Sequence, residues 1–428
     1  MTETQPSALA FEATIFQEIR AAARITIADP RFAARAARLL LRQRRAAHVR
    51  ARHEATGLHV PPFVIYSITD RCNLDCEGCY DKLLHRHDRP ELPDENVRRI
   101  LGEMRDVGVS VMLLAGGEPL LRESLLDFTA DFPEILFLLF TNGSLIDAAV
   151  IERLRDQRHV VPVLSIEGDE TLTDRRRGRG TYDHVMAAMT RLRKRRVFFG
   201  TSTTLTSENY DLHLDPSHLR DLIGRGCRLF YSINYVPVQP GTEHLQLRPE
   251  QVHDLERRLA GFRTSLPAIF IAFPHDEIAL GGCLAAGRGF LHINAYGDVE
   301  PCPFSPYSDT NLTDMSFGDA LASPLLQKIL RSGVVLDETD GQCALWKKRD
   351  WVCRLLEEGG DGEALRASPD SMSAEGGDGE ALRASPDSMS AEGGEGETRS
   401  VPPSPMFAEG REGEAQGSSP DPRFTERG

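Results

Sequence analysis

Short runs of apolar residues recur along residues 60–275, and amphipathic stretches separate them. Most of these runs are almost continuously apolar, which is typical of parallel strands buried on both faces. The strand candidates are residues 63–67, 110–114, 135–140, 160–166, 197–204 and 228–235. The helix candidates between them include residues 94–107, 145–156, 182–193 and 216–226. Six such repeats predict an α/β fold with parallel strands and right-handed crossovers, whose chemistry lies at the carboxyl ends of the strands.

The chain divides into four predicted regions. They are an Arg/Ala-rich helical segment at residues 1–57, the α/β core at 58–275, a small cysteine-rich module at 276–357 and a tail at 358–428. The tail repeats the unit GGDGEALRASPDSMSAE without change at 359–375 and 376–392, and two degraded copies follow. Each unit has too few large apolar residues to bury a core, so we predict a disordered tail rather than a solenoid.

Arginines recur every three or four residues in the N-terminal segment, which places them along one face of a helix. They are Arg31, Arg35, Arg38, Arg42 and Arg45. We favour a solvated helix that packs on the main domain. The alternative is a cationic face that meets an anionic membrane, a nucleic acid or an acidic partner.

The net charge of -14 comes mostly from the tail, so the folded part is only mildly acidic and a nucleic-acid partner is not indicated. No apolar run is long enough to span a membrane, and the N-terminus lacks the pattern of a signal peptide. We therefore expect a cytoplasmic protein. In that compartment the clustered ones among its eight cysteines are expected to bind metal rather than to form disulfides, whereas the isolated Cys227 is expected to be a buried thiol.

Three cysteines follow the first predicted strand in the sequence Cys72-Asn-Leu-Asp-Cys76-Glu-Gly-Cys79. A structural zinc site wants four ligands. A four-iron cluster held by three cysteines keeps one iron open to an outside ligand. The spacing therefore fits an open iron–sulfur cluster better than a closed zinc site.

This spacing is similar to the signature of the radical S-adenosylmethionine superfamily, whose fold is a partial (β/α)6 TIM-like barrel. The resemblance implies that the open iron of a [4Fe-4S] cluster binds S-adenosylmethionine and that one electron then yields methionine and a 5′-deoxyadenosyl radical. Many members carry an aromatic residue before the third cysteine, where this chain has Gly78.

Further motifs follow the next three strands. Gly116-Gly117-Glu118-Pro119 resembles the stretch that contacts the methionyl amino group in this superfamily, and its glycines allow a close approach of the backbone. Asn142 and Ser165 end the third and fourth strands, where the resemblance implies contacts to the cofactor's ribose. Arg177 fits a D-x-x-R-G-x-G pattern of related enzymes and could pair with the methionyl carboxylate. Each of these motifs could instead be an ordinary turn or a solvated loop.

The last four cysteines, Cys283, Cys302, Cys343 and Cys353, lie in the 276–357 region. The segment from Cys283 through Gly297 to Cys302 resembles the opening of SPASM and twitch extensions, which bind auxiliary iron–sulfur clusters. Four ligands suffice for one cluster, so we predict a shortened, twitch-like module. Two alternatives stay open: a structural zinc site, and a cluster held by three cysteines with Cys353 left for other chemistry.

The resemblance implies a radical enzyme that modifies a peptide or protein, with a flavodoxin or ferredoxin as its electron donor. A radical enzyme of cofactor biosynthesis is the alternative within the same chemistry. A non-enzymatic iron–sulfur protein that carries electrons or senses redox state would explain the cysteines but not the motifs after the strands. No catalytic acid or base can be named from the sequence, because Glu167, His184 and His292 have structural explanations as well.

Overall fold

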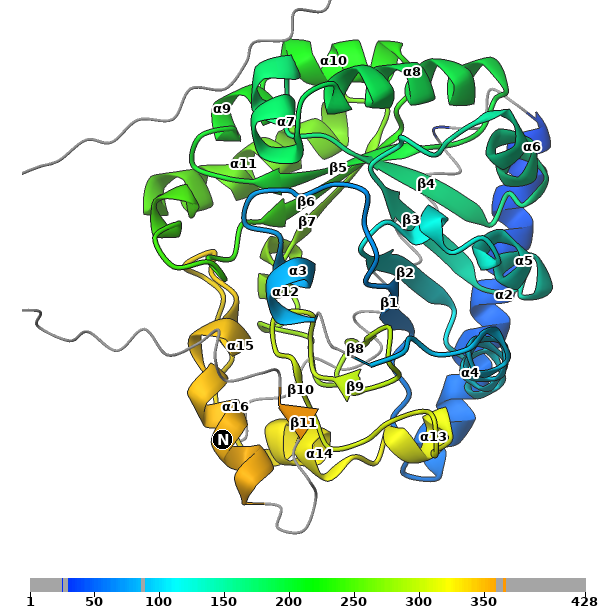
Figure 1. Ribbon diagram of the computed structural model, residues 1–428, viewed down its shortest axis with the longest axis vertical. Coiled ribbons are helices and arrows are strands. Elements are labelled where there is room, and N and C mark those ends of the chain that lie inside the picture. The colour runs from blue at the N-terminus through cyan, green and yellow to red at the C-terminus, as the bar shows by residue number, and fades with distance from the viewer. Residues whose placement is uncertain (1–24, 26–29, 86–88, 359–364, 367–428) are drawn as a thin grey trace, which may run out of the picture. The chain divides into compact units, whose positions relative to one another are not determined.

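A nine-stranded sheet forms the centre of the protein in the computed structural model, which describes residues 25, 30–85, 89–358 and 365–366. Its strand order is β7-β6-β5-β4-β3-β2-β1-β8-β9 (Figure 1). The strands are β1 (Phe63–Thr69), β2 (Val111–Gly116), β3 (Leu136–Thr141), β4 (Val160–Ser165), β5 (Gly200–Leu205), β6 (Leu229–Asn234), β7 (Ile269–Phe273), β8 (Phe290–Ile293) and β9 (Val299–Glu300). Neighbouring strands pair in parallel throughout, except that β9 is antiparallel to β8.

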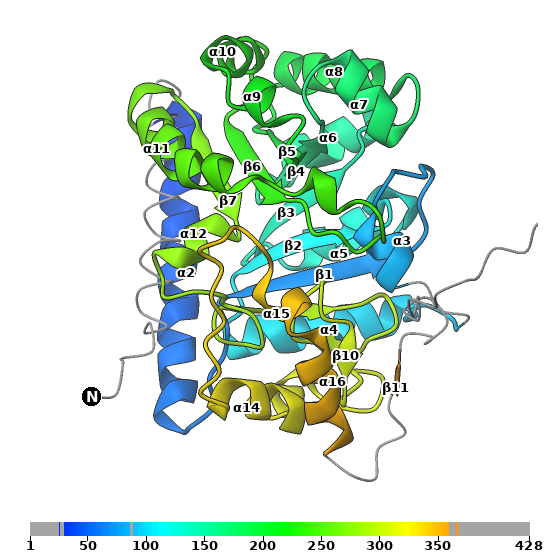
Figure 2. The same ribbon diagram turned by 90° about the vertical axis from the view of Figure 1, so that its left-hand side faces the viewer.

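The longer helices lie outside the curved sheet (Figures 1 and 2), and helices of different lengths connect its strands. In the core region they are α3 (Tyr80–Leu84), α4 (Asp94–Val107), α5 (Leu125–Asp131), α6 (Ala148–Asp156), α7 (Glu170–Arg177), α8 (Thr181–Lys194), α9 (Tyr210–His213), α10 (Pro216–Gly224), α11 (Pro249–Ser265) and α12 (His275–Ile278), with short 3-10 turns η1 (Pro119–Leu121) and η2 (Glu243–Leu245). The last region holds β10 (Tyr307–Ser308), α13 (Phe317–Ala320), α14 (Pro324–Arg331), α15 (Ala344–Lys347) and α16 (Arg349–Glu357).

Local sequence explains where these elements begin and what they bury. Helix α4 places four apolar side chains against the sheet, and Gly108 ends it in the left-handed conformation that glycine adopts without strain. Asp147 and Asp169 accept hydrogen bonds from the first turns of α6 and α7, which explains why these helices start at the next residue in each case. Strand β1 is buried along its whole length, as expected for the middle of a parallel sheet.

The predicted α/β fold, a partial TIM-like barrel, is confirmed, and the sheet extends beyond the six predicted strands. Strand β7 was not predicted, because a run of five apolar residues cannot be told from a buried helical segment by periodicity. Strand β8 comes from the 276–357 region and pairs in parallel with β1. The four-part division of the chain stays a prediction, and its third region contributes a strand to the central sheet.

Helix α2 (Pro30–Ala55) packs against the barrel, as the favoured interpretation of the N-terminal segment predicts. The Gln43 side-chain amide donates to the Ser110 carbonyl at 2.9 Å, and Arg50 donates to the Gly108 carbonyl. Arg42 donates a hydrogen bond to the carbonyl of Pro133, so this cationic side chain helps to attach α2 to the rest of the protein. The side chains of Arg31 and Arg35 lie outside the described residues.

Almost all of the predicted repeat tail lies outside the described residues. Within it, Leu365–Arg366 form strand β11, which pairs antiparallel with β10. Among the helices that the structure describes, none is both long and apolar enough to cross a membrane.

Candidate active site

A cavity of about 190 Å³ opens at the carboxyl ends of strands β1 to β6. Nearly all of the cofactor-binding and first-cluster residues expected from the sequence line it: Cys72, Cys76, Cys79, Gly116, Gly117, Glu118, Asn142, Ser165 and Arg177. Pro119 does not line the cavity; it is buried behind it as the first residue of η1. Because the carboxyl ends of parallel strands meet at one edge, residues far apart in the chain converge there.

Two glycines let the loop after β2 lie directly on the cysteine loop. A Cβ at Gly116 would stand 2.3 Å from the Thr69 carbonyl oxygen, and one at Gly117 would stand 2.2 Å from the Arg71 carbonyl oxygen. Two backbone hydrogen bonds stabilise this contact. The Gly117 amide donates to the Thr69 carbonyl oxygen at 2.8 Å, and the Glu118 amide donates to the Arg71 carbonyl oxygen at 2.8 Å. Only residues without side chains permit this approach.

Glu118 is buried beneath the cavity, with its carboxylate held in three places. Oε1 accepts from the Thr141 hydroxyl at 2.8 Å and from the Leu120 amide at 3.2 Å, and Oε2 accepts from the Asn142 amide at 2.8 Å. Burial raises the pKa of Glu118, and these hydrogen bonds oppose that rise. A carboxylate offers about four acceptor positions, so one position on Oε2 remains for a donor such as an ammonium group.

Asn142 ties the loop after β3 to the cysteine loop. Its amide nitrogen donates to the Asn73 side-chain oxygen at 2.8 Å, and Asn73 in turn donates to the Ser144 hydroxyl at 2.9 Å. Asn142 therefore positions the loop between Cys72 and Cys76 in addition to facing the cavity. Ser165 lies 3.2 Å from the hydroxyl of Ser202 on β5, so two hydroxyls stand side by side in the wall.

Arg177 and its neighbour Arg176 are held together by one buried carboxylate. Glu167, from the loop after β4, pairs with Arg176 at 2.7 Å and with Arg177 at 2.6 Å. Burial by itself raises the pKa of Glu167, but the two guanidinium groups outweigh it and hold the pKa below its usual value. The Glu77 amide also donates to the Arg176 carbonyl at 2.9 Å, which fixes the cysteine loop to the end of α7.

The three thiols of the cysteine loop lie close enough to influence one another's ionisation. Burial raises the pKa of Cys72 to about 11, and burial also raises the pKa of Cys79. Thiols in such surroundings bind metal as thiolates only when the metal supplies the compensating charge. Three thiols facing one cavity, next to two guanidinium groups, suit a cluster with an open iron and an anionic ligand.

Gly78 is required by the packing of the loop. It has a φ of +62°, and a Cβ there would stand 2.4 Å from the Tyr235 hydroxyl oxygen. Tyr235 is buried and donates to the Thr242 hydroxyl at 2.8 Å. A tyrosine from the end of β6 thus covers the position before the third cysteine.

Residues 66–213 match the family model described as the Radical SAM superfamily. The match spans the cysteine loop, Gly116–Glu118 and Arg177, all of which line the cavity. The chain carries a radical SAM domain at residues 66–213. It is therefore an enzyme that uses S-adenosylmethionine and a [4Fe-4S] cluster.

Relatives of this radical SAM enzyme differ in what their names say they make. An AdoMet-dependent heme synthase of Methanosarcina barkeri is 24% identical over 73% of this chain and 96% of its own length. The subtilosin biosynthesis protein AlbA of Bacillus subtilis is 24% identical over 63% of this chain and 61% of its own length. The crystal structure of Streptococcus suis SuiB bound to precursor peptide SuiA shares the fold, with a TM-score of 0.55, 20% identity and coverage of 74% of this chain and 75% of that one.

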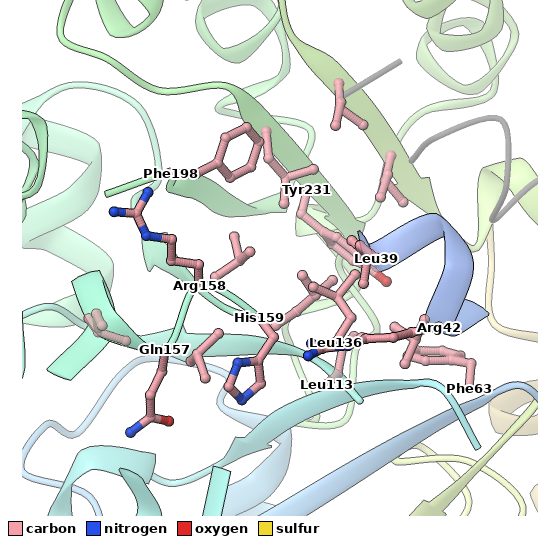
Figure 3. A pocket seen from close by; sticks show the side chains of 18 of the residues that line it. Leu39, Arg42, Phe63, Leu113, Leu136, Gln157, Arg158, His159, Phe198 and Tyr231 are labelled. Atoms are coloured by element: carbon pink, nitrogen blue, oxygen red, sulfur yellow. The ribbon is translucent and has the colours of Figure 1, made fainter. Parts of the chain in front are cut away.

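A second cavity, of about 760 Å³, lies at the opposite ends of the strands (Figure 3). Its wall is mostly apolar and includes the first residues of β1 and β3, Phe63 and Leu136, together with Leu39 and Arg42 of α2. None of its described lining residues is a cysteine. Although it is the larger space, the three thiols of the cysteine loop line the smaller cavity instead.

Three of the four cysteines in the 276–357 region come together. Cys283, Cys302 and Cys343 are buried and line one small cavity, and the thiols of Cys302 and Cys343 lie within hydrogen-bonding reach. Cys353 is placed elsewhere, on α16, with its sulfur 3.8 Å from a carboxylate oxygen of Glu357. The structure therefore groups three of the predicted auxiliary ligands and separates the fourth.

A buried polar network joins this region to the radical SAM barrel. His292 on β8 pairs with Glu300 on β9 at 2.7 Å and with the Ser67 hydroxyl on β1 at 2.8 Å. His85, just after α3, lies 3.6 Å from the same carboxylate. Burial by itself lowers the pKa of His85, but the Glu300 carboxylate outweighs this effect and raises the pKa to about 9. An ionic contact therefore links the residue just after α3 to strand β9.

Several lining residues were not predicted. Arg176, Asp81, Ser202 and Thr204 all face the cavity. Ser202 and Thr204 carried a readable signal, since polar residues two apart on a buried strand share one face and lie near its carboxyl end. Asp81 sits on α3, whose orientation depends on contacts made far along the chain.

Proposed function

We propose that the enzyme cleaves S-adenosylmethionine reductively at a cluster held by Cys72, Cys76 and Cys79 and modifies a peptide or protein. The observation that carries the site assignment is the convergence of these thiols with Glu118 and Arg177 on one cavity. A bound [4Fe-4S] cluster with S-adenosylmethionine on its open iron supplies a 5′-deoxyadenosyl radical, which abstracts a hydrogen atom from the substrate.

The chain's own residues bind and orient the cofactor. Glu118 offers its remaining acceptor position to the methionyl ammonium group. Arg177, which is paired with Glu167, would bind the methionyl carboxylate. The hydroxyl of Ser165 and the side-chain amide of Asn142 would contact the ribose, and Gly116 and Gly117 let the two loops that flank the cavity lie in contact.

Anaerobic reconstitution with iron and sulfide, followed by reduction in the presence of S-adenosylmethionine, tests this assignment. We expect release of 5′-deoxyadenosine from the wild type and none from Cys76→Ala. A matched control is Cys227→Ala, because Cys227 is buried outside the site and bonds only to Thr201 and the Leu229 carbonyl in the described structure. Release from Cys76→Ala equal to that of Cys227→Ala would reject the site.

Two substrate classes are supported by different observations. The likeness in fold to SuiB and the relationship to AlbA favour a peptide. The heme synthase match, which spans 96% of that relative, favours a tetrapyrrole as the second candidate. Mass spectrometry can distinguish the two substrate classes. The enzyme is incubated either with a precursor peptide encoded beside this gene or with a heme-type tetrapyrrole. Only the true substrate should change mass, and S-adenosylmethionine should be consumed in proportion to that change.

We propose a flavodoxin or a ferredoxin as the electron donor. Cluster potentials in proteins span about -700 to +450 mV, and cleavage of a carbon–sulfur bond requires a donor near the low end. Replacing a chemical reductant by reduced flavodoxin should sustain 5′-deoxyadenosine release. A rate no higher than that without any donor would contradict this choice.

A further inference from the structure

The cavity that joins the three C-terminal thiols also holds two buried glutamates. Cys283 follows α12, Cys302 follows β9, and Cys343 caps the start of α15. Glu277 and Glu338 line the same cavity, and their side chains are almost completely buried. A ligand atom of Glu277, one of Cys283 and one of Glu338 all lie within 4.8 Å of one another.

Each glutamate is held by one oxygen and presents the other. Glu277 accepts from the amide of Leu284 through Oε2, and Glu338 accepts from the amide of Ala344 through Oε1 at 3.2 Å. Their other oxygens, Glu277 Oε1 and Glu338 Oε2, are buried and have no hydrogen-bond partner among the described residues. The Glu338 carboxylate also lies within hydrogen-bonding reach of the Cys283 thiol, and a carboxylate oxygen of each glutamate lies within 4.8 Å of the Cys283 sulfur.

Such a group of acids and thiols is costly to bury without a cation. An unpaired buried carboxylate loses several kcal/mol of solvation, which a protein recovers through an ion pair, a proton or a metal. Arg288 is the cationic side chain that acts on both glutamates, and its Nη2 makes no hydrogen bond in the described structure. Lys347 also acts on Glu338 but pairs with Asp340, so neither of these two cations is bonded to either carboxylate in the described structure.

Glu338 lies on a loop that is hydrogen-bonded near two of the cysteines. The Cys283 amide donates to the Leu336 carbonyl at 3.1 Å, two residues before Glu338. At the other end, the Ala344 amide that follows Cys343 holds the Glu338 side chain. The loop of Glu338 is therefore hydrogen-bonded near both Cys283 and Cys343. The Glu277 side chain is hydrogen-bonded only near Cys283 among the described residues.

We propose that Glu338 is the fourth protein ligand of the auxiliary iron–sulfur cluster, together with Cys283, Cys302 and Cys343, and that Cys353 is not a ligand. This rests on the proposed function, in which this region holds an auxiliary cluster. Carboxylate oxygen is an accepted ligand of iron, so a three-thiolate, one-carboxylate set completes four corners.

The site stands next to the radical SAM cavity. Ile233, Phe273 and Phe304 line both spaces, so a wall of three apolar side chains separates the two clusters. A cluster held by Cys283, Cys302, Cys343 and Glu338 would be electronically distinct from a cluster held by Cys72, Cys76 and Cys79. Spectroscopy can therefore observe it separately.

The experiment uses the full chain with Cys72, Cys76 and Cys79 all changed to alanine, which leaves the auxiliary cluster as the only one expected. In this background we expect iron and inorganic sulfide in equal amounts and an electron paramagnetic resonance signal after reduction. Adding Cys353→Ala should change neither the iron content nor the signal. Adding Glu338→Gln should lower the iron content severalfold and shift the signal of the remainder.

Two further variants separate loss of a ligand from loss of the fold. Glu338→Cys supplies a thiolate at the same place and should retain iron with a shifted signal, which a misfolded chain would not do. Glu277→Gln is the matched control and should keep the signal unchanged. The assignment is wrong if Cys353→Ala lowers the iron content while Glu338→Gln keeps the signal of the parent. It is also wrong if Glu277→Gln shifts the signal and Glu338→Gln does not.

A parent that holds zinc without sulfide would also overturn the inference. Release of 5′-deoxyadenosine by the wild type is measured separately, so failure of the proposed function is distinguishable. No release together with the expected auxiliary signals would reject the radical reaction and leave the ligand assignment standing.

Discussion

The pairing of Glu167 with Arg176 and Arg177 makes a sharp prediction about how the cofactor site is kept in shape. Changing Glu167→Gln removes the carboxylate that pairs with both guanidinium groups. The Glu167 side chain is 2% exposed, and those of Arg176 and Arg177 are 16% and 11% exposed. Water therefore cannot replace the lost carboxylate, and breaking such a buried pair costs about 3–5 kcal/mol.

The same helix provides a control. Arg175 on α7 pairs with Glu208, and both side chains are largely exposed. An exposed pair contributes only about 0.2–1 kcal/mol, because solvent screens it. Glu208→Gln makes the same chemical change on the same helix without leaving a buried charge.

Thermal denaturation and S-adenosylmethionine binding of the reconstituted protein measure the effect. We expect Glu167→Gln to lower the melting temperature by several degrees and to weaken cofactor binding at least tenfold, because Arg177 loses its orientation. Glu208→Gln should match the wild type in both. Equal melting temperatures for the two variants would refute the argument that this carboxylate organises the site.

Two further predictions concern the loops and the response to acid. Gly117→Ala places a Cβ 2.2 Å from the Arg71 carbonyl oxygen and should abolish stable cluster binding. Gly224→Ala is the control, because its Cβ would have nothing within 4 Å, and it should keep the wild-type iron content. Equal iron contents in the two variants would contradict the argument that the loops require a glycine at residue 117. Burial lowers the pKa of His213 to about 4. Between pH 6.5 and pH 4 the unfolded chain therefore binds a proton at this residue that the folded chain does not bind. The free energy of unfolding should fall by up to about 1.4 kcal/mol per pH unit as the pH drops through this range. His213→Asn should flatten the plot of melting temperature against pH in that range, and an unchanged slope would show that His213 is not the group responsible.

The sequence was informative wherever chemistry followed a strand directly. Glu118, Asn142 and Ser165 could be placed on one cavity because each ends a strand, and parallel strands deliver their ends to one edge. The same rule could have been applied to Ser202 on β5. These predictions needed only local order along the chain.

Features that depend on distant contacts could not be predicted. Both Arg176 and Arg177 turn toward Glu167, and no spacing in the basic run distinguishes them. The separation of Cys353 from Cys343 follows from the packing of α16, and the placement of Glu338 beside Cys283 follows from a backbone hydrogen bond between two loops. Such contacts are set by the assembled core rather than by periodicity.

The pairing of β8 with β1 has a consequence for how the protein is made. Ser67 on β1 and His292 on β8 are 225 positions apart, so at about 5–20 residues per second the ribosome needs roughly 10–45 s to supply the neighbour of β1. During that interval β1 is an exposed, apolar edge strand that carries the cysteine loop, and such edges invite pairing with other chains. A fragment that ends before residue 290 keeps this edge permanently, so we expect it to aggregate even though its three cysteines are intact.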